Sequence, residues 1–260
     1  MANMNSAIEV SGLSHVYGGN VAALEDISLR VAEGRFTVIV GPSGCGKTSL
    51  LMMLAGLRAQ SQGTIHCLGR PMPEPDPLRV GVIFQEASLY PWLTALENIE
   101  FPLSLRGGSV MEHVKRAEHR KRAEAMLELV GLAGFGARYP HELSGGMKQR
   151  VSIARGLVQD PPVLLMDEPF AALDEQTRMT MGHELLRIWS TTSKTVVFVT
   201  HSLTEAVYLA DEVLVMSARP GRIIDRIEVT LPRPRTYEMM ATDVFGRLRE
   251  RIWQQIRKSE

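Results

Sequence analysis

The sequence has few cysteines and no excess of charge of either sign. Cys45 and Cys67 are its two cysteines among 260 residues, so it does not depend on a disulfide framework, and a reducing compartment is the expected setting. Lysine and arginine together number 29, as do aspartate and glutamate, so no overall basic field draws the chain to nucleic acid or to acidic lipid.

Long apolar runs and targeting signals are also missing. The first ten residues, MANMNSAIEV, lack the basic segment and apolar stretch of a secretion signal, and no apolar run approaches the length of a membrane span. Any membrane role is therefore expected to depend on a partner. A hydrophobic content of 45% still suffices for one large domain, or for a core with a subdomain.

A glycine-rich segment, GPSGCGKT at 41–48, fits the pattern GxxxxGK[ST]. A β-branched run at 37–40 precedes it and an apolar helical pattern at 49–57 follows, and these flanks argue against a chance glycine-rich turn. Such a loop aims backbone N–H groups at a polyphosphate, with Lys47 reaching the β and γ phosphates and Thr48 offering its hydroxyl to Mg²⁺. Alone, the motif predicts only nucleotide binding. The predicted nucleotide-binding residues in this segment are Gly41, Pro42, Ser43, Gly44, Cys45, Gly46, Lys47, Thr48 and Ser49.

Cys45 lies inside this loop and has two interpretations. The simpler one is a small side chain that fills space. The alternative is a redox-sensitive thiol whose modification blocks nucleotide entry.

Two adjacent acids, Asp167 and Glu168, follow the apolar run at 163–166. This is the carboxyl end of a predicted strand, where open α/β sheets place their ligands. Buried charges must be paired or metal-bound, and bound Mg²⁺ and ATP account for both acids directly. We therefore expect Asp167 in the magnesium shell, directly or through water, and Glu168 orienting or deprotonating the attacking water.

A second possible anion site opens the segment LSGGMKQR at 143–150. Ser144, Gly145 and Gly146 precede an apparent helix at 147–160, so they form either an ordinary helix cap or a second phosphate-binding helix start. The second interpretation places two phosphate sites on one chain.

With these motifs in this order, the chain resembles an ABC-type ATPase subunit over nearly its whole length. LSGGM matches the family signature, Gln85 its Q-loop, Asp174 its D-loop and His201 its switch histidine. The resemblance implies a head-to-tail homodimer in which the P-loop of one copy and the LSGGM of the other bind the same ATP. It adds Ser144, Gly145, Gly146 and Asp174 to the ATP-binding residues, and implies ATP and Mg²⁺ as ligands.

The resemblance also suggests roles for three isolated side chains. His201 follows an apolar run and could merely cap a helix, but the family implies a contact with the γ phosphate. Gln85 is expected to reach Mg²⁺ or the lytic water. Tyr17 resembles the adenine-stacking aromatic, with an ordinary strand tyrosine as the alternative. The predicted catalytic residues are Glu168, His201, Lys47 and Gln85, and the predicted metal-binding residues are Thr48, Gln85 and Asp167.

The fold class expected is α/β: a P-loop NTPase (RecA-like) core with a mostly parallel sheet, an N-terminal antiparallel β subdomain and an inserted α-helical subdomain. The core is expected at 1–86 and 160–230, the helical subdomain at 87–159, and a C-terminal linker and helix at 231–260. Residues 220–235 are expected to form a short hairpin and a proline-bearing linker. The basic run at 115–122 is interleaved with glutamates, so it favours a solvated helix face over a nucleic-acid site.

Two further segments resemble one branch of the family, the importer ATPases for nitrate, aliphatic sulfonates and taurine. They are PWLT at 91–94 and RPGRI at 219–223. This implies two transmembrane permease subunits docked near 85–92 and an extracytoplasmic solute-binding protein that contacts only the permease. The chain would then lie peripherally at the cytoplasmic face of the inner membrane.

Two rival functions remain to be weighed. A soluble ABC ATPase acting on DNA or ribosomes would interrupt its ATP motifs with long coiled coils or carry two ATPase units, and neither feature is present. A regulatory subunit that does not hydrolyse ATP would be expected to lack Glu168 or His201, and both are present. The tail at 236–260 is expected to rest on the core or on the other subunit.

Overall fold

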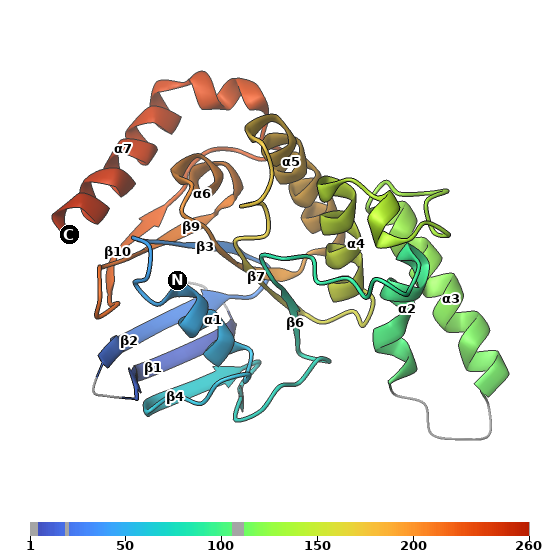
Figure 1. Ribbon diagram of the computed structural model, residues 1–260. Coiled ribbons are helices and arrows are strands. Elements are labelled where there is room, and N and C mark those ends of the chain that lie inside the picture. The colour runs from blue at the N-terminus through green and yellow to red at the C-terminus, as the bar shows by residue number, and fades with distance from the viewer. Residues whose placement is uncertain (1–4, 19–20, 106–111, 260) are drawn as a thin grey trace.

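The structure is a computed structural model that describes residues 5–18, 21–105 and 112–259 (Figure 1). It contains two sheets. The larger is built from six strands in the order β10 (Ile223–Glu228), β9 (Glu212–Met216), β3 (Phe36–Val40), β8 (Thr195–Val199), β7 (Val163–Asp167) and β6 (Val80–Ile83). Strands β9 to β6 run parallel, and only β10 is antiparallel to its neighbour.

The smaller sheet is antiparallel, as expected for the N-terminal β subdomain. Its four strands lie in the order β2 (Val21–Ala32), β1 (Ser6–Tyr17), β4 (Gln62–Cys67) and β5 (Arg70–Pro71).

The central parallel strands are buried on both faces. Every residue of β3, β7 and β8 is buried, which is why these strands read as apolar runs without alternation. Val38 and Val40 of β3 face a core shared with the later helices, whereas Ile39 faces a second core shared with the smaller sheet. Helix α1 (Lys47–Leu54) packs in that second core between the two sheets.

The helical insert forms the right side of Figure 1. It contains α2 (Ala95–Ser104), α3 (Glu112–Leu129), the short 3₁₀ helix η1 (Pro140–Glu142) and α4 (Gly145–Leu157). Thr94 and Glu97 form a reciprocal capping box that starts α2. Within the described part of the basic run, Arg116 and Arg120 are exposed, and Arg120 pairs with Glu124 at 3.3 Å, as a solvated face would.

The C-terminal helices pack on the core that includes Val38 and Val40 of β3. They are α5 (Glu175–Thr192), α6 (Leu203–Leu209), η2 (Tyr237–Ala241) and α7 (Asp243–Lys258). Helix α7 buries Phe245, Ile252 and Ile256 in the core cluster that also contains α6. In this chain the tail therefore rests on its own core. Among the described residues, no helix has the length and apolarity needed to cross a bilayer.

Two details differ from the sequence-based expectations. Strands β4 and β5 were not expected; only Ile65 and Cys67 of β4 are buried, so its apolar alternation is too short to stand out. Residues 220–235 do not form a hairpin among themselves, because their single strand, β10, pairs with the preceding strand β9. The prediction of a hairpin within 220–235 was therefore wrong, because the strand that pairs with β10 lies before this segment.

Candidate functional site

The predicted site residues follow four adjacent parallel strands. The P-loop follows β3, His201 follows β8 by two residues, Glu168 directly follows β7, and Gln85 follows β6 by two residues. Because β3, β8, β7 and β6 are consecutive in the sheet, these residues gather at one edge. It is the carboxyl edge, where open α/β sheets bind ligands.

The P-loop wraps around the ammonium of Lys47. This side chain is only 6% exposed, and its Nζ donates to the carbonyls of Gly41 at 2.8 Å and Pro42 at 2.9 Å. Gly46 precedes α1 with φ of 103°, and a Cβ there would lie 2.6 Å from the side chain of Leu24. Glycine is therefore required at Gly46 both for the backbone angle and for the close approach of β2.

Cys45 is buried within the loop, with its Sγ 4.0 Å from the Lys47 Nζ. Burial raises the pKa of the Cys45 thiol, and the nearby Lys47 charge opposes this only partly. A buried thiol with a raised pKa forms little thiolate, so the packing interpretation of Cys45 is favoured over the redox interpretation.

Thr48 and Asp167 are brought together from different elements. The Thr48 hydroxyl, in the first turn of α1, donates to Asp167 Oδ1 at the end of β7 at 3.1 Å. Asp167 is only 6% exposed. Burial raises the pKa of its carboxyl; the adjacent Glu168 charge adds to this, and the Thr48 hydrogen bond and the Lys47 charge oppose it.

These two oxygens fit a magnesium site that shares its ion with a nucleotide. Among the described residues, no group of three or more histidine, cysteine or acidic side chains could hold a metal alone. Mg²⁺ commonly takes one or two protein oxygens and completes its shell with water and substrate phosphates. The hydroxyl and carboxylate beside the P-loop match that donor set.

Glu168 and His201 form a pair across neighbouring strands. His201 Nδ1 lies 2.9 Å from Glu168 Oε2, while the backbone N–H of Glu168 donates to Val199 of β8 at 2.9 Å. Glu168 has φ of 43°, a left-handed conformation that is uncommon for a residue with a side chain. Such strain clusters at functional sites, and the β8 contact holds it in place.

Gln85 is exposed and lies in a loop that α4 holds by its backbone. The Arg155 guanidinium donates to the carbonyls of Ala87 at 2.7 Å and Ser88 at 2.9 Å, and the Gln149 amide donates to that of Phe84 at 3.4 Å. The loop after β6 is thus connected directly to the helix that follows LSGG.

Tyr17 lies at the end of β1, beside the start of α1. Its hydroxyl is 2.7 Å from that of Ser49, and the Arg58 guanidinium lies 5.0 Å from the ring centroid and also contacts the hydroxyl. The ring is partly exposed rather than packed in the core. An exposed ring beside the P-loop is compatible with adenine stacking. The contact of Arg58 with this ring was not predicted, because no sequence pattern indicates it.

The remaining predicted nucleotide residues lie on other helix starts. Ser144 caps α4 by accepting from the Met147 N–H, and Asp174 caps α5 by accepting from the Thr177 N–H. A Cβ on Gly146 would lie 3.3 Å from Thr177, so these two helix starts are neighbours. In Figure 1, β6 lies between α1 and α4.

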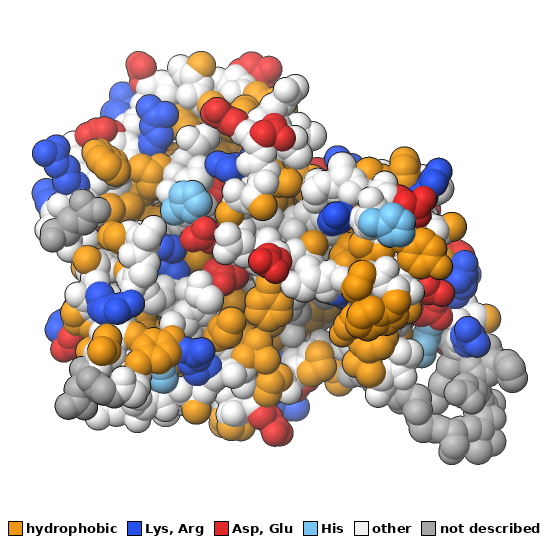
Figure 2. Space-filling model, viewed as in Figure 1, with side chains coloured by type: hydrophobic (Ala, Val, Ile, Leu, Met, Phe, Trp, Pro, Cys, Tyr) orange, Lys and Arg blue, Asp and Glu red, His pale blue; other side chains and the backbone are white. Residues whose placement is uncertain are grey.

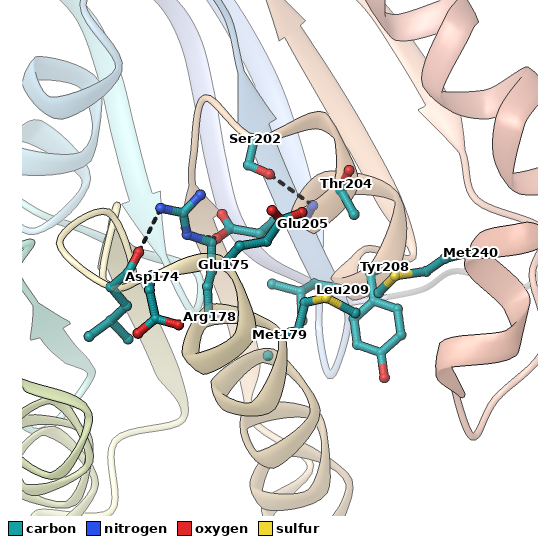
Figure 3. Close-up of a pocket in the computed structure, with 12 residues that line it drawn as sticks. Asp174, Glu175, Arg178, Met179, Ser202, Thr204, Glu205, Tyr208, Leu209 and Met240 are labelled. Carbon is teal, nitrogen blue, oxygen red and sulfur yellow. Dashed lines mark hydrogen bonds and ion pairs between the residues drawn. The ribbon is translucent and has the colours of Figure 1, made fainter.

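A polar network missed by sequence reasoning joins the Asp174 loop to the His201 loop. Arg178 of α5 donates to the Leu173 carbonyl at 2.9 Å and pairs with Glu205 of α6 at 3.6 Å. Glu205 also accepts from the Thr200 hydroxyl, next to His201. Leu173, Arg178 and Glu205 border a cavity of about 470 Å³ beside α6, and Met240 of the tail also lines it (Figure 3). The Arg178–Glu205 pair joins two different helices, and no local pattern predicts it.

A strand, a glycine loop with a buried lysine, a hydroxyl–carboxylate pair and a glutamate–histidine pair on adjacent parallel strands define a P-loop ATPase. A family model described as ABC transporter matches residues 24–171, more than half of the chain. The chain belongs to this ABC transporter family, as an ATPase that binds ATP.

Similar proteins extend the match to most of the chain. An uncharacterized ABC transporter ATP-binding protein of Methanocaldococcus jannaschii is 47% identical over 235 residues, covering 89% of this chain and 85% of that protein. The aliphatic sulfonates import ATP-binding protein SsuB of Bacillus cereus is 41% identical over 254 residues, covering 96% of each. The dimeric ATP-binding cassette MJ0796 bound to ADP and phosphate superimposes with a TM-score of 0.73 at 31% identity, covering 86% of this chain and all of that one.

Proposed function

We propose that this chain is the ATPase subunit of an importer and that two copies close head to tail on two Mg²⁺·ATP molecules. One observation carries the proposal: the Glu168–His201 pair at 2.9 Å lies on the same sheet edge as the P-loop and the Thr48–Asp167 pair. Binding and hydrolytic groups are thus assembled on consecutive strands.

On the nucleotide side, Lys47 and the loop amides bind the β and γ phosphates. Thr48 and Asp167 hold Mg²⁺, with Gln85 completing the site from the neighbouring strand. When bound, the ion neutralises charge on the phosphate oxygens as the terminal bond breaks. Tyr17 stacks on the adenine at the other end of the nucleotide.

On the hydrolytic side, Glu168 orients or deprotonates the attacking water and His201 holds the Glu168 carboxylate. A carboxylate only accepts hydrogen bonds, so we assign a proton to His201 Nδ1 in this contact. In the neutral ring, Nε2 is then a hydrogen-bond acceptor. It can donate to a γ-phosphate oxygen only when the ring carries a second proton. His201 is therefore proposed to respond to the charge of the nucleotide.

The second half of each ATP site is proposed to come from the other copy. Ser144 and Gly145 are exposed at the start of α4, and Asp174 is exposed nearby. Their backbone N–H groups and the positive end of α4 suit the triphosphate held by a partner's P-loop. The dimer of the similar cassette MJ0796 supports this arrangement.

The Glu168→Gln variant tests it. We expect this variant to bind ATP, to lose turnover and to form a stable dimer with ATP and Mg²⁺, because the ATP that joins the two copies is no longer hydrolysed. Light scattering and crosslinking measure the dimer, and Glu128→Gln on the exposed face of α3 serves as the matched control. A Glu168→Gln protein that stays monomeric at saturating ATP and Mg²⁺ would refute the composite site.

The permease is proposed to dock on the apolar surface before and along α2. Trp92 is 70% exposed, and its ring is 5.5 Å from that of Tyr90, which packs 4.7 Å from Phe101. Figure 2 shows hydrophobic side chains gathered over this part of the helical insert. Because Arg155 ties the adjoining loop to α4, docking there can reach both Gln85 and the LSGG segment.

The solute is proposed to be a small molecule or ion such as an aliphatic sulfonate, taurine or nitrate, delivered to the permease by an extracytoplasmic solute-binding protein. The aliphatic sulfonate importer among the similar proteins supports this class. The chain then works peripherally at the cytoplasmic face of the inner membrane. Co-purification with the permease encoded nearby, followed by solute-stimulated ATPase assays in membranes with each solute, would test both partner and solute. No stimulation by any of the three would overturn this class.

A further inference from the structure

Arg233 and Arg235, in the C-terminal segment, bind the C-terminal end of α6, the helix that follows His201. The Arg235 guanidinium, only 3% exposed, donates to the carbonyls of Val207 and Ala210, each at 3.0 Å. The Arg233 guanidinium donates to the Leu209 carbonyl at 2.8 Å and to Asp211 Oδ1 at 2.9 Å. Three carbonyls at the end of one helix are thus bound by two arginines from a distant segment.

This arrangement does more than cover the core. The last carbonyls of a helix have no partner within the helix, and a cation there interacts favourably with the helix dipole. Burying an arginine is costly, and an apolar side chain would fill the same space without that cost. Burial lowers the pKa of Arg235 to about 10, so the guanidinium still carries its charge near neutral pH.

Arg233 and Arg235, which together we call the clamp, are held by further contacts to neighbouring elements. Arg233 stacks 4.2 Å over the Trp189 ring of α5, and Asp211 also accepts from the Phe36 N–H at 2.9 Å, which connects the clamp to β3. The ring of Tyr208 in α6 stacks on Tyr237 of η2 with a centroid distance of 6.0 Å and an interplanar angle of 3°.

The other end of α6 carries the hydrolytic histidine. His201 directly precedes the N-cap Ser202, whose hydroxyl accepts from the Glu205 N–H at 3.3 Å. The helix has only seven residues, so the clamp lies roughly 10 Å from His201 along a rigid element. A displacement at the clamped end is transmitted to the imidazole.

We infer that Arg233 and Arg235 are positioning residues for hydrolysis: they fix α6 so that His201 meets Glu168. This inference rests on the roles proposed above for His201 and Glu168. It assigns the proline-arginine segment and the tail behind it a part in the chemistry of ATP hydrolysis, although neither lies at the nucleotide edge of the sheet.

The test compares Arg235→Met and Arg235→Lys with the exposed α7 variant Arg249→Met in the full chain. Lysine keeps the charge but has a single donor centre, which cannot reach both carbonyls as the guanidinium does. We expect kcat for ATP to fall roughly tenfold or more in Arg235→Met and less in Arg235→Lys, because small misplacements of catalytic groups have effects of this size. The affinity for the fluorescent analogue TNP-ATP should stay within about twofold of wild type, since the P-loop is untouched.

A spectroscopic signal separates positioning from simple stabilisation. In protein labelled on the histidine rings, the His201 resonance is assigned by its loss in His201→Gln. We expect it to shift in both Arg235 variants and to stay unchanged in Arg249→Met. If Arg235→Met does not fold, Arg233→Met carries the same test, because that side chain is 25% exposed and more tolerant of change.

An unchanged kcat, or an unmoved His201 resonance, in folded variants would overturn the inference. A fall in kcat that merely follows the loss of TNP-ATP binding would overturn it too. If wild-type protein with Mg²⁺ fails to hydrolyse ATP, the proposed function fails instead. The His201 resonance then still reports whether the clamp positions this ring.

Discussion

The backbone of Gly221 presses against the outside of the P-loop, and this contact can be tested by adding a single methyl group. Gly221 donates to the Ala23 carbonyl at 2.9 Å and accepts from the Glu25 N–H at 3.0 Å, which locks it onto β2. A Cβ at this position would lie 2.2 Å from the Cys45 carbonyl oxygen.

The expected effect of Gly221→Ala follows from that distance. Real Cβ atoms essentially never approach closer than 3.0 Å, so the backbones of residue 221 and Cys45 must separate by about 0.8 Å. A misplacement near 1 Å can cost about a hundredfold in rate or binding, so we expect KM for ATP to rise roughly tenfold to a hundredfold. Overpacking of this kind also costs about 1–3 kcal/mol of stability.

Two assays separate these effects. Steady-state ATPase kinetics and TNP-ATP titration report the nucleotide site, and thermal melting reports stability. The matched control is Gly246→Ala in α7, where a Cβ meets nothing within 4 Å. If Gly221→Ala binds ATP as wild type does, the segment after β9 does not shape the P-loop.

Three further predictions concern individual side chains. Asp167→Asn should lower Mg²⁺-dependent turnover roughly a hundredfold while leaving metal-free TNP-ATP binding intact, because one carboxylate charge beside Thr48 is lost; undiminished turnover would remove Asp167 from the metal site. Burial raises the pKa of Glu205 above its ordinary 4.5, so its contribution to stability is full below that value and is lost as pH rises through the raised pKa. The melting temperature of Glu205→Gln relative to wild type should therefore increase as the pH rises above about 4, and a constant difference would contradict this. Iodoacetamide should leave Cys45 unmodified and the ATPase rate unchanged in the folded protein; rapid inactivation through Cys45 would restore the redox interpretation.

The sequence could predict positions at the ends of strands, where polar residues come after apolar runs. The P-loop, Asp167 and His201 each follow an apolar run, and parallel strands bring such positions to one edge. The sequence order of these runs does not state which strands are neighbours. Their order in the sheet, and hence the 2.9 Å contact of Glu168 with His201, appears only in the fold.

The arginines that support the site could not be predicted in the same way. Arg155 contacts residues 67 and 68 positions away, and Arg235 contacts residues 25 and 28 positions away. Each donates to backbone carbonyls, which every residue possesses, so the partner leaves no mark in the sequence. An arginine beside prolines after the last strand was visible, but nothing local indicated that its target is the end of α6.

These supporting arginines share one physical arrangement that bears on how the ATPase is coupled to transport. Arg155 holds the loop of Gln85, Arg178 holds the loop of Asp174, and Arg235 holds the helix of His201. In each case a guanidinium, with donors in a fixed fork, binds the backbone of a segment proposed to touch nucleotide. Backbone attachment moves a whole loop rather than one side chain, so a displacement of α4, α5 or the tail is transmitted to the site. Because Arg155 extends from α4 to the loop beside the proposed permease surface, its hydrogen bonds connect that surface to the helix that follows LSGG.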